Sequence, residues 1–241
     1  MRLRSLTKHI REQNWFAVFL DFFIVVVGIL IAFQITNWNE AQRDKDAARK
    51  YKARLITDVE LSIQRNRLQI SYGQQEVRQL DLVLAALDNC RLSEEDTPIF
   101  AAGLYNMGKF DLPIMVMGTI DELNATGNFP LIGSPQLRRS VSETVREFHT
   151  KLAIDPQISG RTIPSINYVR SRVRFLLDVH QPPSKSIDPD KVFYDFEALC
   201  TDVMFVHAVT TVREMTLANI GLNDDLADKQ AELLEKLRGD D

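Results

Sequence analysis

The sequence is poor in the features that usually indicate a specific chemistry. Its formal net charge of −4 and pI near 5.7 provide no basic field to attract phosphates, so we expect no nucleic-acid partner. Its two cysteines, Cys90 and Cys200, are too few for a disulfide framework. Only one hydrophobic run is long enough to span a bilayer. These features favour one membrane anchor that carries one polar domain.

Catalytic and metal-binding patterns are also missing from the sequence. No His-x-x-x-His, Cys-x-x-Cys or Glu-x-x-His spacing places metal ligands on one helix face. Residues 103–109 have the glycine and lysine spacing of a phosphate-binding loop, but Phe110 replaces the metal-binding Ser or Thr and no strand precedes it. No nucleophile elbow or dinucleotide loop is present. We therefore predict no catalytic residue, cofactor or metal site, and no enzyme activity. The histidines are expected at the surface: His9, His149, His180 and His207.

The apolar run from Trp15 to Ile35 organises the chain. As a helix it would be roughly 31 Å long, enough to cross the hydrocarbon core of a bilayer. It is longer than the apolar core of a cleaved signal peptide, so we expect it to stay in the protein. Trp15 and Trp38 bracket the run as predicted interface anchors. We divide the chain into a basic amphipathic N-terminus (1–13), a transmembrane helix (14–38) and a helical bundle domain (39–241).

The sequence alone decides orientation only weakly. Lys and Arg within about 15 residues of the run number four on each side, so the positive-inside rule gives no preference. Long following domains are translocated largely regardless of charge, and a short basic N-terminus usually stays in the cytoplasm. We therefore favour a cytoplasmic N-terminus and an exported C-terminal domain. The N-terminus is typical of a short helix lying on lipid headgroups, although a solvated basic tail fits equally well.

Asp21 is the ionisable residue of the apolar run. Charge at that depth is costly, which favours a functional role facing a partner or water. Asp21, Val25, Gly28 and Ala32 share one helical stripe, and the Gly28-x-x-x-Ala32 pair lets two helices approach closely. We predict that this stripe contacts another membrane protein or a second copy of the chain. The alternative, that Asp21 is hydrated by local thinning of the bilayer, stays open.

The end of the apolar run carries a resemblance to a known family. Residues 25–40 are Val-Val-Val-Gly-Ile-Leu-Ile-Ala-Phe-Gln-Ile-Thr-Asn-Trp-Asn-Glu. This string resembles the Gly-Ile-Leu-Ile-x-x-Gln-x-x-Asn-Trp-Asn-Glu signature of an uncharacterised bacterial family of single-span membrane proteins. Residues 121–132 are similar to that family's Glu-Leu-x-x-x-Gly-Asn-x-x-x-Ile segment. The resemblance implies a bacterial inner-membrane protein with a helical domain, and it transfers no catalytic residues.

Residues 40–89 predict one long helix. They contain no proline and a single glycine, and their apolar residues recur at alternating steps of three and four, as in a coiled-coil seam. The helix would be about 75 Å long and continue from the membrane span. Asn66 and Gly73 interrupt the seam. They either fix the register and admit a close neighbour or mark a loosely packed position.

Capping and breaking residues predict the later elements. The expected features are a short helix from the Ser93–Pro98 cluster to about Met107, an irregular stretch over 108–118, a capping box at Thr119–Glu122 with Gly127 ending its helix, a helix starting at Ser134–Pro135, a kink or break between Pro156 and Pro164, and a last helical region over 192–237.

The predicted fold class is all-α, with the membrane helix continuing into an elongated antiparallel bundle of three long helices plus short ones. The three rods, 40–89, 135–180 and 200–237, are similar in length and suggest an up-down-up order. That order separates Cys90 from Cys200 and forbids a disulfide. If the middle rod instead folds back as a hairpin, the two cysteines can bond.

The function predicted from these features is a non-enzymatic interaction or scaffold protein of the inner membrane, as a subunit of a larger membrane complex. Two alternatives remain open. One is a bundle that senses a ligand and signals through a partner. The other is a proton-linked partner of a channel complex that acts through Asp21.

Overall fold

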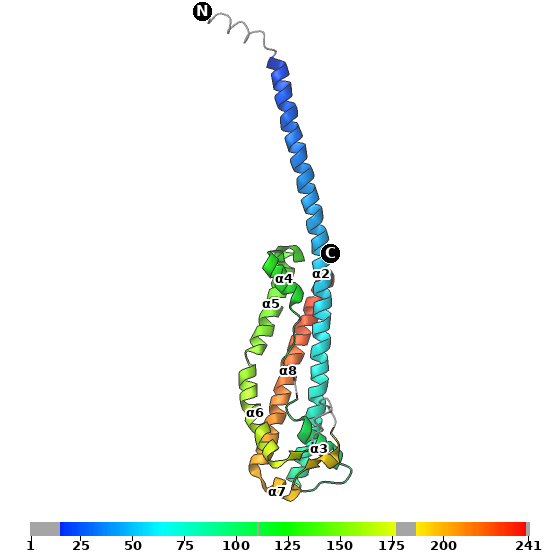
Figure 1. Cartoon of the computed structure of the whole chain (residues 1–241), viewed down its shortest axis with the longest axis vertical. Helices are drawn as coiled ribbons and strands as arrows, with labels where there is room; N and C mark the ends of the chain where they lie inside the picture. Colours follow the sequence, from blue (N-terminus) through cyan, green and yellow to red (C-terminus); the bar gives the residue numbers. More distant parts are fainter. Residues whose placement is uncertain (1–14, 110, 177–186, 240–241) are drawn as a thin grey trace, which may run out of the picture. The chain divides into compact units, whose positions relative to one another are not determined.

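The computed structural model describes residues 15–109, 111–176 and 187–239, and within them the chain is almost entirely helical, which confirms the all-α class (Figure 1). The predicted basic N-terminus (1–13), His180 and the side chain of Trp15 lie outside the described residues. The chain divides into two compact units, Met1–Lys50 and Tyr51–Asp241, and we call the second the body. The elements are α2 (Trp15–Asp88), α3 (Thr97–Asn106), α4 (Gly118–Thr126), η1 (Phe129–Ile132), α5 (Pro135–Leu152), α6 (Asp155–Arg172), β1 (Arg174–Phe175), η2 (Pro189–Lys191), β2 (Val192–Phe193), α7 (Phe196–Thr201) and α8 (Val203–Gly239).

Helix α2 contains the apolar run. Among the described residues it is the one helix that is long and apolar enough to cross a membrane, by length and composition. None of the residues in its most apolar window is buried against protein. The absence of proline, which would remove a helix hydrogen bond, explains why the helix is unbroken to Asp88.

Within the body, α8 runs alongside α2 in the opposite direction (Figure 1). Arg213 near the start of α8 pairs with Asp81, and Arg238 near its end pairs with Glu60. The two helices approach closely at Gly73, where an added Cβ would lie 2.7 Å from Cγ1 of Ile220. Gly73 therefore admits a close neighbour, which is one of its two predicted roles.

Helices α5 and α6 cover the other side of α8. Ser140 of α5 accepts a hydrogen bond from Lys236, and Lys151 donates to Asp225 at 2.9 Å, so α5 runs opposite to α8. The middle rod is broken, but at residues 153–154 and not between Pro156 and Pro164 as predicted. Helix α5 ends at Leu152, and α6 begins at Asp155 and continues through Pro164. The middle rod ends earlier than predicted, since α6 stops at Arg172 and a two-residue strand follows. Helices α5 and α6 thus follow the same direction as α2.

An extended segment connects α3, near the end of α2, to α4. We call residues 107–117, between α3 and α4, the strap; all but residue 110 are described. Three side chains of α2 bind its backbone: Asn66 binds Ile114, Ser62 accepts from the N–H of Val116, and Asp58 accepts from the N–H of Thr119 just beyond it. From Asn66 back to Ser62 the helix spans four residues, or about 6 Å, and from Ile114 to Val116 the extended strap spans two residues, or about 6.6 Å. The two spans match, so the strap lies antiparallel to α2 here. The strap therefore returns the chain along α2.

The strap explains a correction to the predicted topology. Cys90 and Cys200 form a disulfide with a Cα–Cα distance of 5.4 Å, so the prediction that they are far apart is wrong. The middle rod does not fold back as a hairpin either. Because the strap carries the chain back along α2, α5 starts beside α4 and α8 starts beside the end of α2. Both cysteines then lie at one end of the body.

Two apolar clusters lie at the two ends of the body. One, at the disulfide end, surrounds Phe100 and Phe205 and joins α2, α3, α6 and α8. The other, at the α4 end, surrounds Leu55, Leu123 and Leu237. Between them, α8 presents a buried polar stretch: Thr216, Asn219, Asn223 and Gln230.

The helix caps agree with the sequence at two positions and disagree at one. Ser134 caps α5 by accepting from the N–H of Leu137, and Gly127 ends α4 in the left-handed conformation with φ +73°. The predicted capping box is wrong, because the N-cap of α4 is Met117, two residues before Thr119, and Asp58 of α2 accepts from the N–H of Thr119. Glu122 instead binds Arg54 across the helices.

Candidate functional sites

The predicted membrane stripe lies on exposed helix surface. Asp21, Val25, Gly28 and Ala32 are all exposed, and a Cβ added to Gly28 would meet no atom within 4 Å. Most of the described side chains in the rest of the span are exposed as well, with Phe22 at 66% and Leu30 at 59%. Asp21 makes no hydrogen bond or ion pair with another described residue. The stripe is therefore defined by helical spacing, and within the described chain it has no protein partner.

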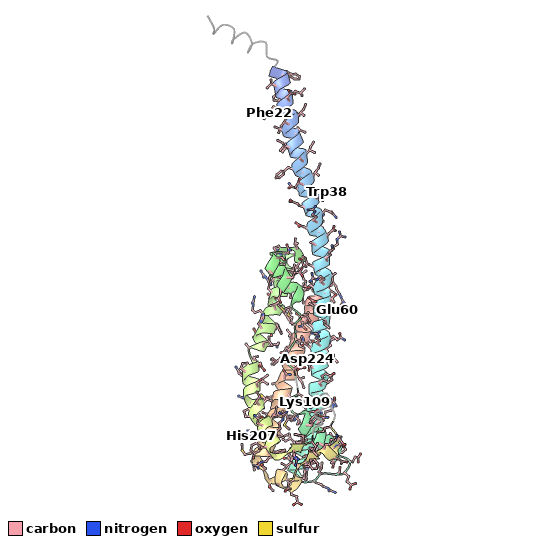
Figure 2. All side chains as sticks on the ribbon, viewed as in Figure 1. Phe22, Trp38, Glu60, Lys109, His207 and Asp224 are labelled. Carbon is pink, nitrogen blue, oxygen red and sulfur yellow. A yellow bond between two sulfur atoms is a disulfide. The ribbon has the colours of Figure 1, made fainter. Side chains whose placement is uncertain are left out.

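Trp38, the second predicted interface anchor, projects from α2 and is 70% exposed (Figure 2). Phe22 projects from the same helix about four turns earlier. An indole with its ring in apolar surroundings and its N–H near water suits the bilayer interface. Trp38 is thus available for the predicted role.

A second candidate site is the polar layer that holds the strap. Asn66 is fully buried; its Oδ1 accepts from the Ile114 N–H at 2.7 Å and its Nδ2 donates to the Ile114 carbonyl at 2.8 Å. Gln230 of α8 donates to the same carbonyl at 3.0 Å, and Asn219 donates to the carbonyl of Asp111. Both helices therefore bind the strap through its backbone. The interpretation of Asn66 as a loosely packed position is wrong.

Glu76 lies where the strap begins. Its side chain comes from α2 and the residue is only 5% exposed. Its Oε1 accepts from the Gly108 N–H at 2.6 Å, and the hydroxyl of Thr216 lies 3.5 Å away. Burial raises the pKa of Glu76 to about 7, while the Gly108 N–H, Thr216 and the charge of Lys109 oppose this rise. Glu76 is therefore a carboxyl group that titrates near neutral pH.

Lys109 follows Gly108 in the strap. Its ammonium lies 3.2 Å from the centroid of the Tyr105 ring and donates to Oδ1 of Asn106. Partial desolvation, with the nearby charge of Arg170, lowers the pKa of Lys109 to about 8. The side chain is exposed, and a cation over an aromatic ring favours the charged form, so Lys109 remains mainly an ammonium at neutral pH.

Two buried amides in this layer are incompletely satisfied. Oδ1 of Asn219 and Oδ1 of Asn223 have no hydrogen-bond partner among the described residues, although both residues are at most 2% exposed. A buried polar atom without a partner costs about 1–3 kcal/mol. Each of these two oxygens therefore lowers the stability of the polar layer.

Sequence reasoning missed Glu76 because the seam was traced through apolar residues. The buried positions of α2 follow Asn66, Gly73, Glu76 and Leu80, whereas Val77 is only partly buried. Steps of seven, three and four residues are a regular seam if polar members are allowed. Asn66 and Gly73 already showed that this face of α2 is not strictly apolar, but nothing in the sequence distinguished Glu76 from the exposed glutamates.

The remaining candidate motifs hold no site in the described part of the chain. Gly103 lies inside α3, where an added Cβ would lie 2.9 Å from Val83, so residues 103–109 form no phosphate-binding loop. His149 and His207 are exposed. No group of three or more His, Cys, Asp or Glu residues among those described is placed to hold a metal ion.

Comparison with known proteins adds no assignment. No protein family, no curated protein and no solved structure matches this chain.

Proposed function

We propose that this chain is a non-enzymatic, single-span protein of the bacterial inner membrane that acts as an interaction or scaffold subunit of a membrane complex. Its span contacts a partner helix through Asp21, Val25, Gly28 and Ala32. Its body, a helical bundle in which α8 runs antiparallel to α2 and to α5, presents a polar surface on one side of the membrane. The observation that carries the proposal is the exposed stripe itself: a carboxyl group and a small-residue pair on one helix face, without a partner in the described chain.

The disulfide supports an exported body. Disulfides form and persist in oxidising compartments such as the bacterial periplasm and are rare in the cytosol. A bonded Cys90–Cys200 pair therefore favours a cytoplasmic N-terminus and a periplasmic C-terminal domain. A reporter active only in the periplasm, fused to the C-terminus, tests this orientation. Activity of a cytoplasm-specific reporter at the same position would contradict it.

The stripe is tested by cross-linking and co-purification of the full chain from native membranes in mild detergent. Gly28→Leu fills the approach surface and Asp21→Asn removes the charge, so both should reduce the amount of partner, or of second copy, recovered. Leu30→Ala, on the opposite face of the span, is the matched control and should leave recovery unchanged. Unchanged recovery with both stripe variants would refute a contact through this face.

A further inference from the structure

Glu76 occupies a junction of three parts of the body. It projects from α2, its carboxyl group faces the N–H of Gly108 at the start of the strap, and Thr216 of α8 lies on its other side. The Thr216 hydroxyl has a shorter bond, 2.9 Å, to the carbonyl of Val212. The short bond from Gly108 is therefore the main stabilisation available to an ionised Glu76.

The charged groups around Glu76 do not neutralise it. From the strap, Lys109 is the nearest cation, and its ammonium is held over Tyr105 rather than paired with Glu76. From α6, Arg170 acts on Lys109. From α8, Arg213 is paired with Asp81. No ion pair of Glu76 occurs among the described residues, so its charged form is stabilised by little besides the Gly108 N–H.

Gly108 is the hinge of the strap. Its φ of +74° lies in the left-handed region, and an added Cβ would collide with the side chain of Ile166 on α6. Glu76 therefore binds the chain at the residue where it turns from α3 into the strap. Three residues further on, Asn219 binds the Asp111 carbonyl, yet its own Oδ1 has no partner among the residues that the structure describes. Opening of this part of the strap would hydrate both Glu76 and that oxygen.

We propose that Glu76 is a proton-dependent latch: the protonated side chain keeps the Gly108 end of the strap closed on α2 and α8, and the ionised side chain releases it. The other end of the strap is bound by Asn66, Ser62 and Gln230, which do not titrate, and it stays closed. The inference does not depend on the proposed membrane contact.

The direction of the pH effect follows from proton linkage. In the closed strap, burial keeps the pKa of Glu76 at about 7, whereas in an opened, hydrated strap it returns to the ordinary 4.5. The closed form therefore holds a proton that the open form releases, and opening becomes more favourable as pH rises from 4.5 to 7. Between pH 5 and 7.5 the opening equilibrium should rise by about 50-fold.

Amide hydrogen exchange of the full chain in detergent tests the latch, with rates corrected for the intrinsic pH dependence of exchange. Protection of peptides covering residues 104–112 should fall by about 50-fold between pH 5 and 7.5. Protection of peptides covering 113–118 should not change. A wild-type profile that is flat across the 104–112 peptides would overturn the proposal without any variant.

Two matched variants assign the effect to Glu76. Glu76→Gln keeps the size and the acceptor for the Gly108 N–H but cannot ionise, so its 104–112 peptides should stay protected at both pH values. Glu60→Gln replaces an exposed glutamate on the same helix, which pairs with Arg238, and should retain the wild-type pH profile. An equal fall in protection in Glu76→Gln would mean that another group controls the strap.

Discussion

Asn66 shows how one polar side chain fixes the position of an extended segment in a helical body. It makes two hydrogen bonds to Ile114 and a third to Gln230, all at a fully buried position. Asn66→Ala leaves the Ile114 N–H buried without an acceptor, so we expect a loss of about 2–3 kcal/mol in the free energy of unfolding. Urea denaturation followed by circular dichroism measures this loss.

The matched control for Asn66 is Asn89→Ala. Asn89 is exposed and bonds only the carbonyl of Ala85 one turn earlier, so its loss should change the free energy of unfolding by less than about 0.5 kcal/mol. If the two variants lose similar amounts, the strap is not held by Asn66.

Ionisation of Glu76 should also make the free energy of unfolding of the body depend on pH. The pKa of Glu76 in the folded body lies above its unfolded value, so its stabilising contribution is present below pH 4.5 and is lost as pH rises to about 7. Because glutamine does not ionise, Glu76→Gln should keep this contribution and be more stable than the wild type above pH 7, by at most about 3 kcal/mol. Denaturation at pH 5 and pH 8 measures the difference, which should be small at pH 5. A gain of equal size at both pH values would contradict the assignment.

The disulfide acts at the scale of elements, because it joins the end of α2 to α7. It closes a loop with a sequence separation of 110 residues, for which chain entropy alone gives about 4–5 kcal/mol of stability. Cys90→Ser should therefore lower the free energy of unfolding by up to that amount, and reductant should lower the wild type equally. Cys200→Ser and the double variant should lose no more than Cys90→Ser. A wild type insensitive to reductant, with free thiols by mass, would contradict the bond.

Some elements could be predicted from sequence and others could not, for physical reasons. Long helices have a local signal, since apolar periodicity, Ser134, Gly127 and Pro156 act within a few residues of the structure they determine. The strap has no such signal. Its backbone is satisfied by side chains of α2 and α8, dozens of residues away, so the sequence showed only an irregular stretch. The error in cysteine topology followed directly from this missing extended segment.

At the scale of the whole molecule, one of the two candidate sites can be predicted from the sequence and the other cannot. The stripe around Asp21 and Gly28 follows from helical spacing in one apolar run, and no tertiary contact is needed to find it. Glu76 looks like any other glutamate on a charged helix. Its burial depends on Gly108 and Thr216, which are distant in sequence. A buried carboxyl of this kind becomes visible only when three elements are packed together.

The body should fold without the membrane span, because both apolar clusters consist of residues from 51 onward. Residues 51–241, exported behind a cleavable signal, should be recovered in the aqueous fraction. They should be helical by circular dichroism, contain the Cys90–Cys200 bond, and unfold in one cooperative transition.

A shorter fragment provides the control for the isolated body. Residues 67–241 lack Leu55, Val59 and Ile63, which belong to the cluster at the α4 end, and they also lack Asn66. This fragment should lose the cooperative transition, because the cluster loses its α2 side and the strap loses its central hydrogen bonds. If the two fragments unfold alike, the α4 end contributes little to folding. If residues 51–241 fail to fold while the full chain in detergent unfolds cooperatively, the span is required for the body to fold.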